Sequence, residues 1–339
     1  MSVDFTVSGD SCEPATVKRL GNAFCAAKLL LAAAEVGVFT ELEKGPVTAG
    51  QLAVALELHP RGVPDFLAAL AALGLLVRED GRYHNSAAAS ALLVRGKPGN
   101  LTGYLGRADR MLYPAWGRLG AALRTGQPQA DDGFATVTND PVKRNSFLSM
   151  MDAVNNQLLP GLLAAYPWSR CHSVADIGGA RGNVAARLAL AHPQLSATVF
   201  DLPEIEPAAQ AHLTALGVAD RVRYQSGDFF TDPLPTADVL ILGHVLHNWA
   251  PEERAVLVKK AHDAVRPGGA VLVYDAMLDP EPTDLDRILV SLNMLLVTVG
   301  GSEYTVDDCS GWLAAAGFGD IRATAVGAAD TLVIGHKSA

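Results

Sequence analysis

The sequence predicts an α/β fold in which a parallel sheet with helices on both faces ends in an antiparallel hairpin, preceded by a smaller helical module. From residue 173 onward, short apolar runs alternate with stretches of helical spacing, which is typical of parallel strands joined by helices. The last two apolar runs are separated only by the turn 327–330, which predicts a hairpin. Residues 1–100 show helical spacing and a single hairpin pattern instead.

The strands of the expected sheet are runs rich in β-branched and other apolar residues, and each is followed by a stretch with helical spacing. Because parallel strands need a crossover between them, this alternation favours a Rossmann-like sheet that is covered on both faces. The expected strands cover residues 173–177, 197–200, 222–225, 239–243 and 270–274, the helices 184–191, 204–216 and 251–264, and the hairpin 321–326 and 331–336.

A different pattern follows the polar tail formed by residues 1–14. The dipeptide Asp80-Gly81 suits the two-residue turn of a hairpin. The expected elements are a helical region over 15–38, a short helix over 47–56 with Thr48 as N-cap, a helix over 59–73 and a hairpin over 75–83. A helix, a turn, a second helix and a hairpin in this order make a winged-helix arrangement.

A winged-helix module can bind DNA, or it can serve as a dimerisation domain or a lid over a substrate. The expected recognition helix carries Arg61 near its start and then Asp65 among apolar residues. Residues 1–100 hold nine basic and ten acidic side chains. Because DNA binding needs a basic face, we interpret the module as a dimerisation domain and expect no nucleic-acid partner.

The composition is that of a folded protein of the cytoplasm. The chain has 339 residues, enough for two domains, and a formal net charge of −9. We see no signal peptide, and charged residues interrupt the apolar stretch 26–39, so we expect a cytoplasmic location without a membrane span. The four cysteines, Cys12, Cys25, Cys171 and Cys309, show no C-x-x-C spacing, which argues against structural zinc and against a disulfide framework.

Residues 101–165 are expected to form helices that connect the two parts and line a ligand pocket. Methionine and aromatic residues recur there, among them Trp116 and Met151. Such a stripe is more often core than pocket, but its place between the module and the sheet favours a ligand site. The expected parts are therefore residues 1–100, 101–165 and 166–339.

A glycine-rich turn follows the first strand of the sheet. The segment 174–183 reads VADIGGARGN, and Asp201 ends the next strand. A bare backbone turn followed by a carboxylate for ribose hydroxyls is typical of a nucleotide or nucleoside site. The dinucleotide fingerprint G-x-G-x-x-G, counted from Gly178, fails at Ala180 and Asn183. The methyltransferase pattern, an acid followed by glycines at alternate positions, fails only at Ala180.

Two further features favour S-adenosylmethionine (SAM) as the cofactor. The segment 226–230 follows the third strand, where an acid can accept from the adenine amino group and an aromatic ring can cover the base. The segment 266–269, RPGG, predicts a tight turn into the fifth strand. Each feature alone could be structural, since Asp228 could simply cap a helix. Together, in this order, the four features predict a nucleoside site for SAM.

These segments make the chain resemble the caffeic-acid-type small-molecule O-methyltransferases of plants and their bacterial natural-product relatives. The resemblance covers nearly the whole chain. It implies a class I methyltransferase fold with a winged-helix dimerisation domain, a homodimer, and SAM as cofactor with S-adenosylhomocysteine (SAH) as product. Its most specific segments are 176–182 (DIGGARG), 200–203 (FDLP), 227–230 (GDFF), 246–249 (LHNW) and 300–303 (GGSE).

The resemblance also implies roles for individual residues. His247 matches the general base of the family and Glu303 the carboxylate beside it. Asp275 is a second carboxylate near the base, one methylene shorter than the glutamate common in plant members. The residues implied for SAM are Asn155, Tyr166, Gly178, Asp201, Leu202, Asp228 and Phe229, with Asn155 and Tyr166 near its methionine end, and those implied for the acceptor pocket are Met151, Met294 and Thr298.

Two further departures from the family pattern concern the turn and the base. Ala180 stands where the family has glycine, so it must tolerate a tight backbone. Asn248 replaces the aspartate that follows the histidine in the family. Because Asn248 and the shorter Asp275 lie close to the base, both could weaken its tuning.

His247 follows the expected strand 239–243, at the carboxyl end of the sheet where ligands bind. A phenol, with a pKa of about 10, is a poor nucleophile at neutral pH, and a histidine can take its proton as the new bond forms. Glu303 would accept from the other ring nitrogen. We expect His244 to contact the cofactor or to pack. Two histidines with Asp275 and Glu303 leave a metal as an alternative, but we expect none.

The leading hypothesis is SAM-dependent O-methylation of an aromatic or polyketide-like small molecule in secondary-metabolite biosynthesis, such as that of an antibiotic. An alternative is C-methylation of an enolisable α-keto acid, in which His247 removes a proton from carbon and a metal helps to hold the enolate. Asn248 does not favour metal ligation, which ranks this alternative lower. A third hypothesis, a non-catalytic SAM sensor that binds DNA, lacks the basic recognition helix it requires.

Overall fold

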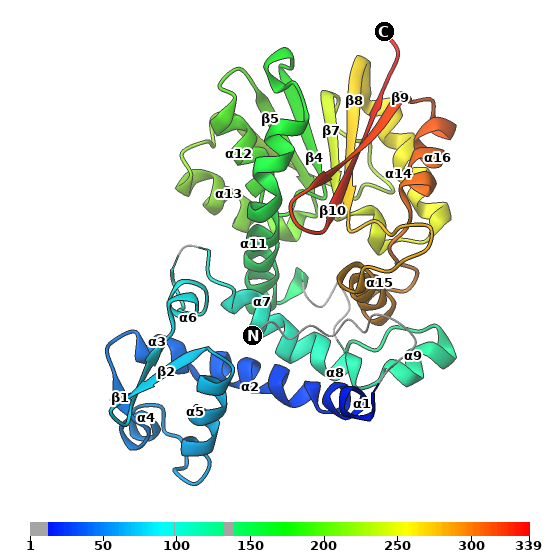
Figure 1. Ribbon diagram of the computed structural model, residues 1–339. Helices are drawn as coiled ribbons and strands as arrows, with labels where there is room; N and C mark the ends of the chain where they lie inside the picture. The colour runs from blue at the N-terminus through cyan, green and yellow to red at the C-terminus, as the bar shows by residue number, and fades with distance from the viewer. Residues whose placement is uncertain (1–12, 98, 132–137) are drawn as a thin grey trace. The chain divides into compact units, whose positions relative to one another are not determined.

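The computed structural model describes residues 13–97, 99–131 and 138–339. Its contacts divide the chain into two compact units, Met1–Tyr113 and Pro114–Ala339 (Figure 1). The division falls inside the stretch expected as a connector, so residues 101–113 group with the first unit and later ones with the second. Across the described ranges, we find no helix with the length and apolar character needed to cross a membrane.

The N-terminal unit combines short helices with a small antiparallel sheet in the order β1-β3-β2. Thr48 caps α4 through a capping box with Gln51, as predicted for this N-cap. Asp80 and Gly81 take φ values of 48° and 75°, the positive angles that the predicted hairpin turn needs. The elements are α1 (Pro14–Gly21), α2 (Ala23–Val36), α3 (Val38–Leu42), β1 (Val47–Thr48), α4 (Ala49–Ala55), α5 (Val63–Ala72), β2 (Leu76–Glu79), β3 (Arg82–Asn85), α6 (Ala87–Leu92), α7 (Thr102–Arg107) and the π-helix η1 (Ala108–Leu112).

The second unit is built on a seven-stranded sheet in the order β6-β5-β4-β7-β8-β10-β9. Strands β6, β5, β4, β7 and β8 are parallel, and β10 pairs antiparallel with both β8 and β9. The predicted parallel sheet with a final antiparallel hairpin is therefore confirmed. The strands are β4 (Ser173–Ile177), β5 (Ser196–Asp201), β6 (Val222–Ser226), β7 (Ala237–Gly243), β8 (Val265–Asp275), β9 (Gly319–Val326) and β10 (Asp330–His336).

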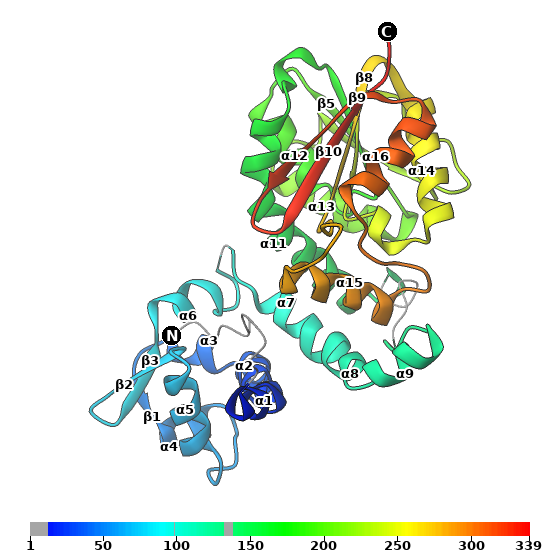
Figure 2. The same cartoon turned by 45° about the vertical axis from the view of Figure 1, so that its right-hand side comes forward.

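Helices cover both faces of this sheet (Figures 1 and 2). Apolar side chains of α11, α12 and α13 fill the core on one face, and those of α14 and α16 fill it on the other. Full burial of a leucine contributes about 1.5–3 kcal/mol, so the two cores hold the sheet rigidly. The helices described from residue 113 onward, on the sheet and away from it, are α8 (Tyr113–Trp116), α9 (Leu119–Thr125), α11 (Pro141–Ala165), η2 (Trp168–Arg170), α12 (Asn183–Ala191), η3 (Pro203–Ile205), α13 (Glu206–Ala215), η4 (Leu246–Asn248), α14 (Pro251–Ala264), α15 (Leu285–Val297) and α16 (Val306–Ala316).

Two features of the second unit differ from the sequence prediction. Helices α15 and α16 lie between β8 and β9, in a stretch for which no element was predicted. The expected turn over 266–269 is an irregular part of β8, with a register shift against β7. Gly269 is needed there, because a Cβ atom would lie 2.2 Å from the Asp238 carbonyl oxygen. The chain therefore bulges within the strand rather than turning before it.

Candidate active site

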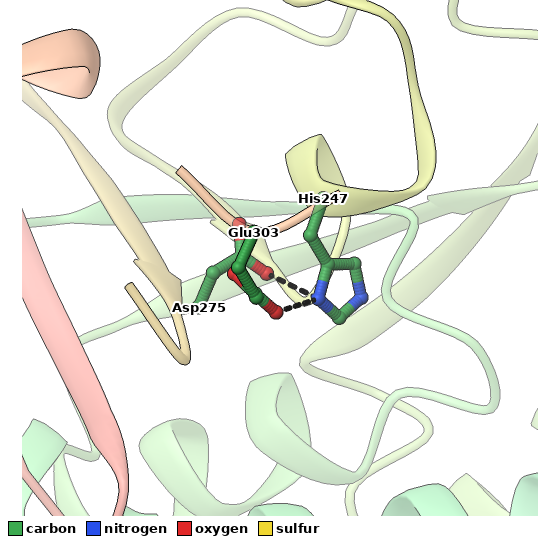
Figure 3. Close-up of side chains that lie close together, drawn as sticks. All are labelled: His247, Asp275 and Glu303. Atoms are coloured by element: carbon green, nitrogen blue, oxygen red, sulfur yellow. Dashed lines mark hydrogen bonds and ion pairs between the residues drawn. The ribbon is translucent and has the colours of Figure 1, made fainter. Parts of the chain in front are cut away.

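Three predicted side chains, those of His247, Asp275 and Glu303, meet at the carboxyl edge of the parallel strands (Figure 3). His247 lies in η4, shortly after β7, and Asp275 is the last residue of β8. Because β7 and β8 are parallel neighbours, the chain leaves both strands at the same edge. The loop between α15 and α16 brings Glu303, and its Ser302 N–H donates to the His247 carbonyl oxygen over 2.9 Å.

The three groups form a buried cluster. His247 Nδ1 lies 2.6 Å from Glu303 Oε1 and 3.3 Å from Asp275 Oδ1, and only the contact with Glu303 has hydrogen-bond geometry. Tyr304 donates its hydroxyl proton to the other Asp275 oxygen over 2.5 Å. Since Nδ1–H donates to Glu303, the neutral ring keeps its lone pair on Nε2. A histidine in this tautomer can act as a base at Nε2.

The carboxylates set the proton affinity of the histidine. Burial by itself lowers the pKa of His247, but Asp275 and Glu303 more than offset this effect and raise the pKa to about 9. Burial also raises the pKa of the Asp275 carboxyl to about 6, although the charge of His247 acts in the opposite direction. The cluster therefore holds a proton more tightly than a free histidine does, which suits it to take one from a hydroxyl group.

Nitrogen and oxygen atoms of these three residues all lie within 4.8 Å of one another, a spacing that a metal ion could also use. However, Nδ1 donates to Glu303 and so has no lone pair for a metal in this tautomer, which leaves only Nε2 as a ligand atom of the ring. One Asp275 oxygen is engaged by Tyr304 as well. These contacts favour an acid–base cluster, and the expectation that no metal takes part stays a prediction.

His244 lies beside His247, with the two rings stacked and their centroids 5.8 Å apart. Its Nε2 lies 3.0 Å from Asp330 Oδ1, at the start of β10. Its edge-to-face partner is Tyr274, at 5.2 Å between centroids. Of the two roles expected for His244, packing and cofactor contact, these partners support packing.

Helix α15 contributes to the same site because it packs against η4. Met294 lies in this helix and Thr298 caps its end. The Thr298 hydroxyl donates to the Met294 carbonyl oxygen over 2.7 Å and accepts from Gly301 N–H over 2.9 Å. Thr298 therefore shapes the loop that carries Glu303. Asn293, a residue that sequence reasoning missed, accepts from Trp116 Nε1 over 2.7 Å.

The turn after β4 presents backbone rather than side chains. Gly178, Ala180 and Gly182 take positive φ values of 68°, 51° and 81°. A side chain at Gly178 would bring its Cβ within 2.8 Å of Val245. Ala180 thus adopts the tight backbone that its departure from the family pattern requires, at a cost of about 1–2 kcal/mol.

Two carboxyls, the buried Asp176 and the half-buried Asp201, lie close to the ends of β4 and β5. Asp201 accepts from Ala180 N–H over 2.8 Å with one oxygen and from Leu202 N–H over 2.7 Å with the other. Burial raises its pKa to about 6 in spite of these two donors. Burial, together with the charge of Asp201, raises the pKa of Asp176 to about 7. Each Asp201 oxygen keeps a lone pair that could accept from a ribose hydroxyl.

The segment after β6 adjoins the glycine turn. Asp228 Oδ1 accepts from Phe230 N–H over 2.8 Å and so stabilises its own turn, which is the structural role considered for it. The Phe229 ring faces the turn, since a Cβ built at Gly178 would lie 3.7 Å from it. Phe229 also packs edge-to-face against Phe230 and Trp249. An aromatic wall therefore borders the glycine turn.

Helix α11 contacts the same turn. Arg181 Nε, in the turn, donates to Asp152 Oδ2 over 2.8 Å. The neighbouring residues Met151 and Asn155 lie on this helix. The Asn155 Oδ1 atom is buried and has no hydrogen-bond partner among the residues that the structure describes. A buried acceptor left unpaired costs about 1–3 kcal/mol, so this atom suits a donor supplied by a ligand.

Comparisons with known proteins identify the family. Residues 116–319 match the model of the O-methyltransferase domain, and residues 19–95 match the model of the O-methyltransferase dimerisation domain. The chain is 48% identical over 328 residues to the tetracenomycin polyketide synthesis 8-O-methyl transferase TcmO of Streptomyces glaucescens, across 96% of this chain and 97% of that protein. The chain belongs to the O-methyltransferase family.

This methyltransferase is also 38% identical over 307 residues to the N,N-dimethyltransferase OxyT of Streptomyces rimosus, across 88% of this chain and 89% of that protein. The crystal structure of human N-acetylserotonin methyltransferase in complex with SAM has a TM-score of 0.89 with it at 29% identity, over 98% of this chain and 100% of that chain. The comparisons confirm the predicted family, the methyltransferase fold, the enzyme class and SAM as the cofactor of the family.

One residue predicted to bind SAM lies away from the site of the methyltransferase. Tyr166 follows α11, and its ring packs against Trp168 and against His336 at the end of β10. Helix α11 rises about 1.5 Å per residue, which carries the chain about 16 Å from Asn155 to Tyr166. Tyr166 therefore lies at the amino-terminal edge of the parallel strands, and the structure does not support its predicted place at the methionine end of SAM.

The asparagine that departs from the family pattern has a local role in the methyltransferase. Asn248 Nδ2 donates to the carbonyl oxygens of His244 and Val245 over 2.9 and 3.3 Å. A carboxylate has no proton to donate in this way. The substitution thus closes the turn that carries His247, and it leaves the hydrogen bond between His247 and Glu303 in place.

Sequence reasoning also missed Arg254, which is only 2% exposed. It lies in α14 on the same face as Leu257, Val258 and Ala261, which are buried as well. Residues at this spacing form the core-facing side of an amphipathic helix. An arginine among them could therefore have been recognised from the sequence as a buried charge. A charge at such a position needs buried partners.

Proposed function

We propose that this methyltransferase transfers the methyl group of SAM to a hydroxyl of an aromatic or polyketide-like small molecule, with His247 as general base, in secondary-metabolite biosynthesis. The observation that carries the proposal is the 2.6 Å contact between His247 and Glu303, which leaves Nε2 of a buried histidine as the basic atom. The 48% identity to a polyketide O-methyltransferase supports the class of acceptor.

Each member of the cluster would have its own role. His247 would take the hydroxyl proton at Nε2 while the oxygen attacks the methyl group, a step worth about 10²–10⁴-fold in rate. Glu303 would accept from Nδ1–H and stabilise the imidazolium. Asp275, held by Tyr304, would add a second negative charge. The same residues could remove a proton from carbon, so the acceptor atom has to be tested.

The residues around the glycine turn fit the cofactor. Gly178 leaves the backbone bare, Asp201 keeps free lone pairs, and Asn155 holds an unpaired buried acceptor. When bound, SAM supplies a methyl group that is already activated on a sulfonium. The residues proposed to hold SAM are Asn155, Gly178, Asp201, Leu202, Asp228 and Phe229.

Asp201→Asn is expected to weaken SAH binding by about 10–100-fold. A charge-assisted hydrogen bond contributes about 1.5–3 kcal/mol, and each 1.4 kcal/mol changes Kd tenfold. Isothermal titration of the variant and the wild type with SAH measures the change. Asp263→Asn on α14, whose carboxylate is exposed, serves as control. An unchanged Kd in a folded Asp201 variant would remove Asp201 from the proposed cofactor site.

The acceptor pocket is proposed to lie between α11 and α15, beside His247. Met151 and Met294 would contribute apolar surface, in line with the expected role of the predicted connector. Trp116 donates to the Asn293 amide oxygen, so the Asn293 NH₂ group, which has no hydrogen-bond acceptor among the described residues, could donate to a ligand. Such a donor suits a carbonyl or hydroxyl oxygen of a polyketide ring.

The acceptor atom can be identified by mass spectrometry after incubation with methyl-labelled SAM and a panel of phenols, hydroxylated polyketide aromatics, arylamines and α-keto acids. We expect the label on oxygen of an aromatic hydroxyl. A label on nitrogen would replace the proposed reaction with the kind named for OxyT, and a label on carbon would replace it with enolate methylation. Either result would keep the fold and the cofactor and overturn the proposed acceptor.

We propose that the enzyme acts as a homodimer in the cytoplasm. The match of residues 19–95 to a dimerisation domain supports the dimer. Helices α1 and α2 also expose large apolar side chains, those of Val17, Leu20 and Phe24, which a partner surface could cover. The cysteine pattern and the lack of a basic recognition helix support the cytoplasmic location and the absence of a nucleic-acid partner.

A further inference from the structure

Arg254 is a buried arginine that the proposed reaction does not use directly. Its hydrogen bonds within the described part of the chain go to oxygen atoms of neutral groups. Taking a guanidinium out of water without a hydrogen-bonded carboxylate is costly, and an apolar side chain of similar length would avoid that cost. The position of Arg254 therefore calls for a reason other than stability.

The guanidinium joins two segments of the site. Arg254 Nε donates to the carbonyl oxygens of Leu246 and Trp249 over 3.0 and 2.8 Å, which flank His247 on either side. Its Nη2 donates to the carbonyl oxygen of Ser302 over 2.7 Å and to its hydroxyl over 3.0 Å. Ser302 directly precedes Glu303. A single planar group thus bridges the turn of the base and the loop of its carboxylate partner.

Arg254 also reaches the third member of the cluster. Its guanidinium lies 4.8 Å from the ring centroid of Tyr304 and 5.4 Å from that of Trp312. The Tyr304 hydroxyl donates to Asp275. His247, Asp275 and Glu303 are far apart in the sequence. Arg254 contacts the segments that carry His247 and Glu303, and it contacts the tyrosine that donates to Asp275.

We propose that Arg254 is a positioning residue of the methyltransferase, which sets the distance between His247 and Glu303 by joining η4 to the loop before α16. This inference rests on the proposed function for its catalytic consequence, but its structural part can be tested without turnover. Arg254 acts through His247 and Glu303 and does not itself touch the acceptor.

Two effects of removing Arg254 on the pKa of His247 have opposite signs, which makes the proposal testable. Loss of the positive charge alone would raise the pKa, because the imidazolium would feel less repulsion. Loss of the Glu303 contact would lower the pKa, because that carboxylate stabilises the imidazolium. Among the described residues, the other titratable groups that act on or contact His247 include Asp275, His244 and Asp330.

The experiment compares Arg254→Met and Arg254→Lys with the wild type, and uses Arg221→Met as matched control. Arg221 also donates to backbone carbonyl oxygens, those of Ala189 and Pro193, but it directly precedes β6. The His247 ring is titrated by NMR in enzyme with labelled histidine, and His247→Gln assigns its signal. Thermal unfolding and SAH binding report the fold and the cofactor site, and kcat is measured with the acceptor that the labelling experiment identifies.

We expect the pKa of His247 to fall by about one unit or more in Arg254→Met and by less in Arg254→Lys. We expect kcat to fall by about 10²-fold in Arg254→Met, the effect of misplacing a reacting group by about 1 Å, with partial recovery in Arg254→Lys. SAH affinity should stay that of the wild type. The control variant should match the wild type in every measurement.

An unchanged or raised pKa of His247 in folded Arg254→Met would overturn the positioning role. If that variant does not fold, Arg254→Lys decides by the same criterion. A lowered pKa with unchanged kcat would uphold the positioning of His247 and overturn the general-base function instead. The two proposals therefore fail in distinguishable ways.

Discussion

Replacing His247 with alanine is expected to lower kcat for methyl transfer by about 10²–10⁴-fold. The alanine side chain cannot take the hydroxyl proton, and it leaves Asp275 and Glu303 without the imidazolium they stabilise. The affinity for SAH should be unchanged, because His247 is not among the residues proposed to hold the cofactor. Single-turnover rates with labelled SAM and isothermal titration with SAH measure the two quantities.

His247→Gln provides a second test of the same role. A glutamine amide can still donate to Glu303, so it spares the buried carboxylates, but it cannot accept a proton at neutral pH. His172→Ala serves as control, since His172 is exposed and precedes β4 at the opposite edge of the sheet. Wild-type turnover in either folded His247 variant would reduce this histidine to a packing residue.

The rate of methyl transfer by the wild type is expected to rise with pH and to level off near the pKa of His247. Burial lowers this pKa, but Asp275 and Glu303 raise it to about 9. Only the neutral ring can take a proton, so the active fraction grows as pH approaches that value from below. At pH 7 the raised pKa leaves a smaller fraction of His247 neutral. The same raised pKa makes the neutral ring a stronger base, which partly offsets the loss in rate.

In Glu303→Gln, the rising limb of the profile of kcat against pH is expected to move to lower pH by about one to three units. The plateau of that profile is expected to fall by about 10²–10⁴-fold. The limb moves because one carboxylate no longer stabilises the imidazolium. The plateau falls because the amide no longer selects the tautomer with its lone pair on Nε2. Profiles of kcat against pH measure both changes, with Glu252→Gln on the exposed side of α14 as control. A limb that stays in place would show that Glu303 does not set the pKa of the base.

Local patterns were sufficient for most of the fold. The bounds predicted for β4 and α14, residues 173–177 and 251–264, are those of the structure, because short-range periodicity and flanking turns define such elements. The stretch between β8 and β9 was not assigned. Its helix α15 is apolar over much of its length, and its borders depend on the cap at Asp284 and on packing against η4.

The candidate site was predictable to different degrees. The glycine turn and Asp201 follow from the spacing of a few residues around two strands. The pairing of His247 with Glu303 came from the resemblance to a family, since no local rule links two residues so far apart. Tyr166 was misplaced because the path of α11 across the sheet is a long-range property that no motif carries.

The sequence by itself determined the α/β class, the glycine turn and a histidine at the carboxyl edge of the sheet, since each depends on neighbouring residues. Only the tertiary structure decided how that histidine is held. The Nδ1 contact with Glu303, the Tyr304 hydroxyl on Asp275 and the guanidinium of Arg254 between two loops are contacts across long sequence separations. Hydrogen bonds need distances and angles set within tenths of an ångström, and only the packed backbone supplies them.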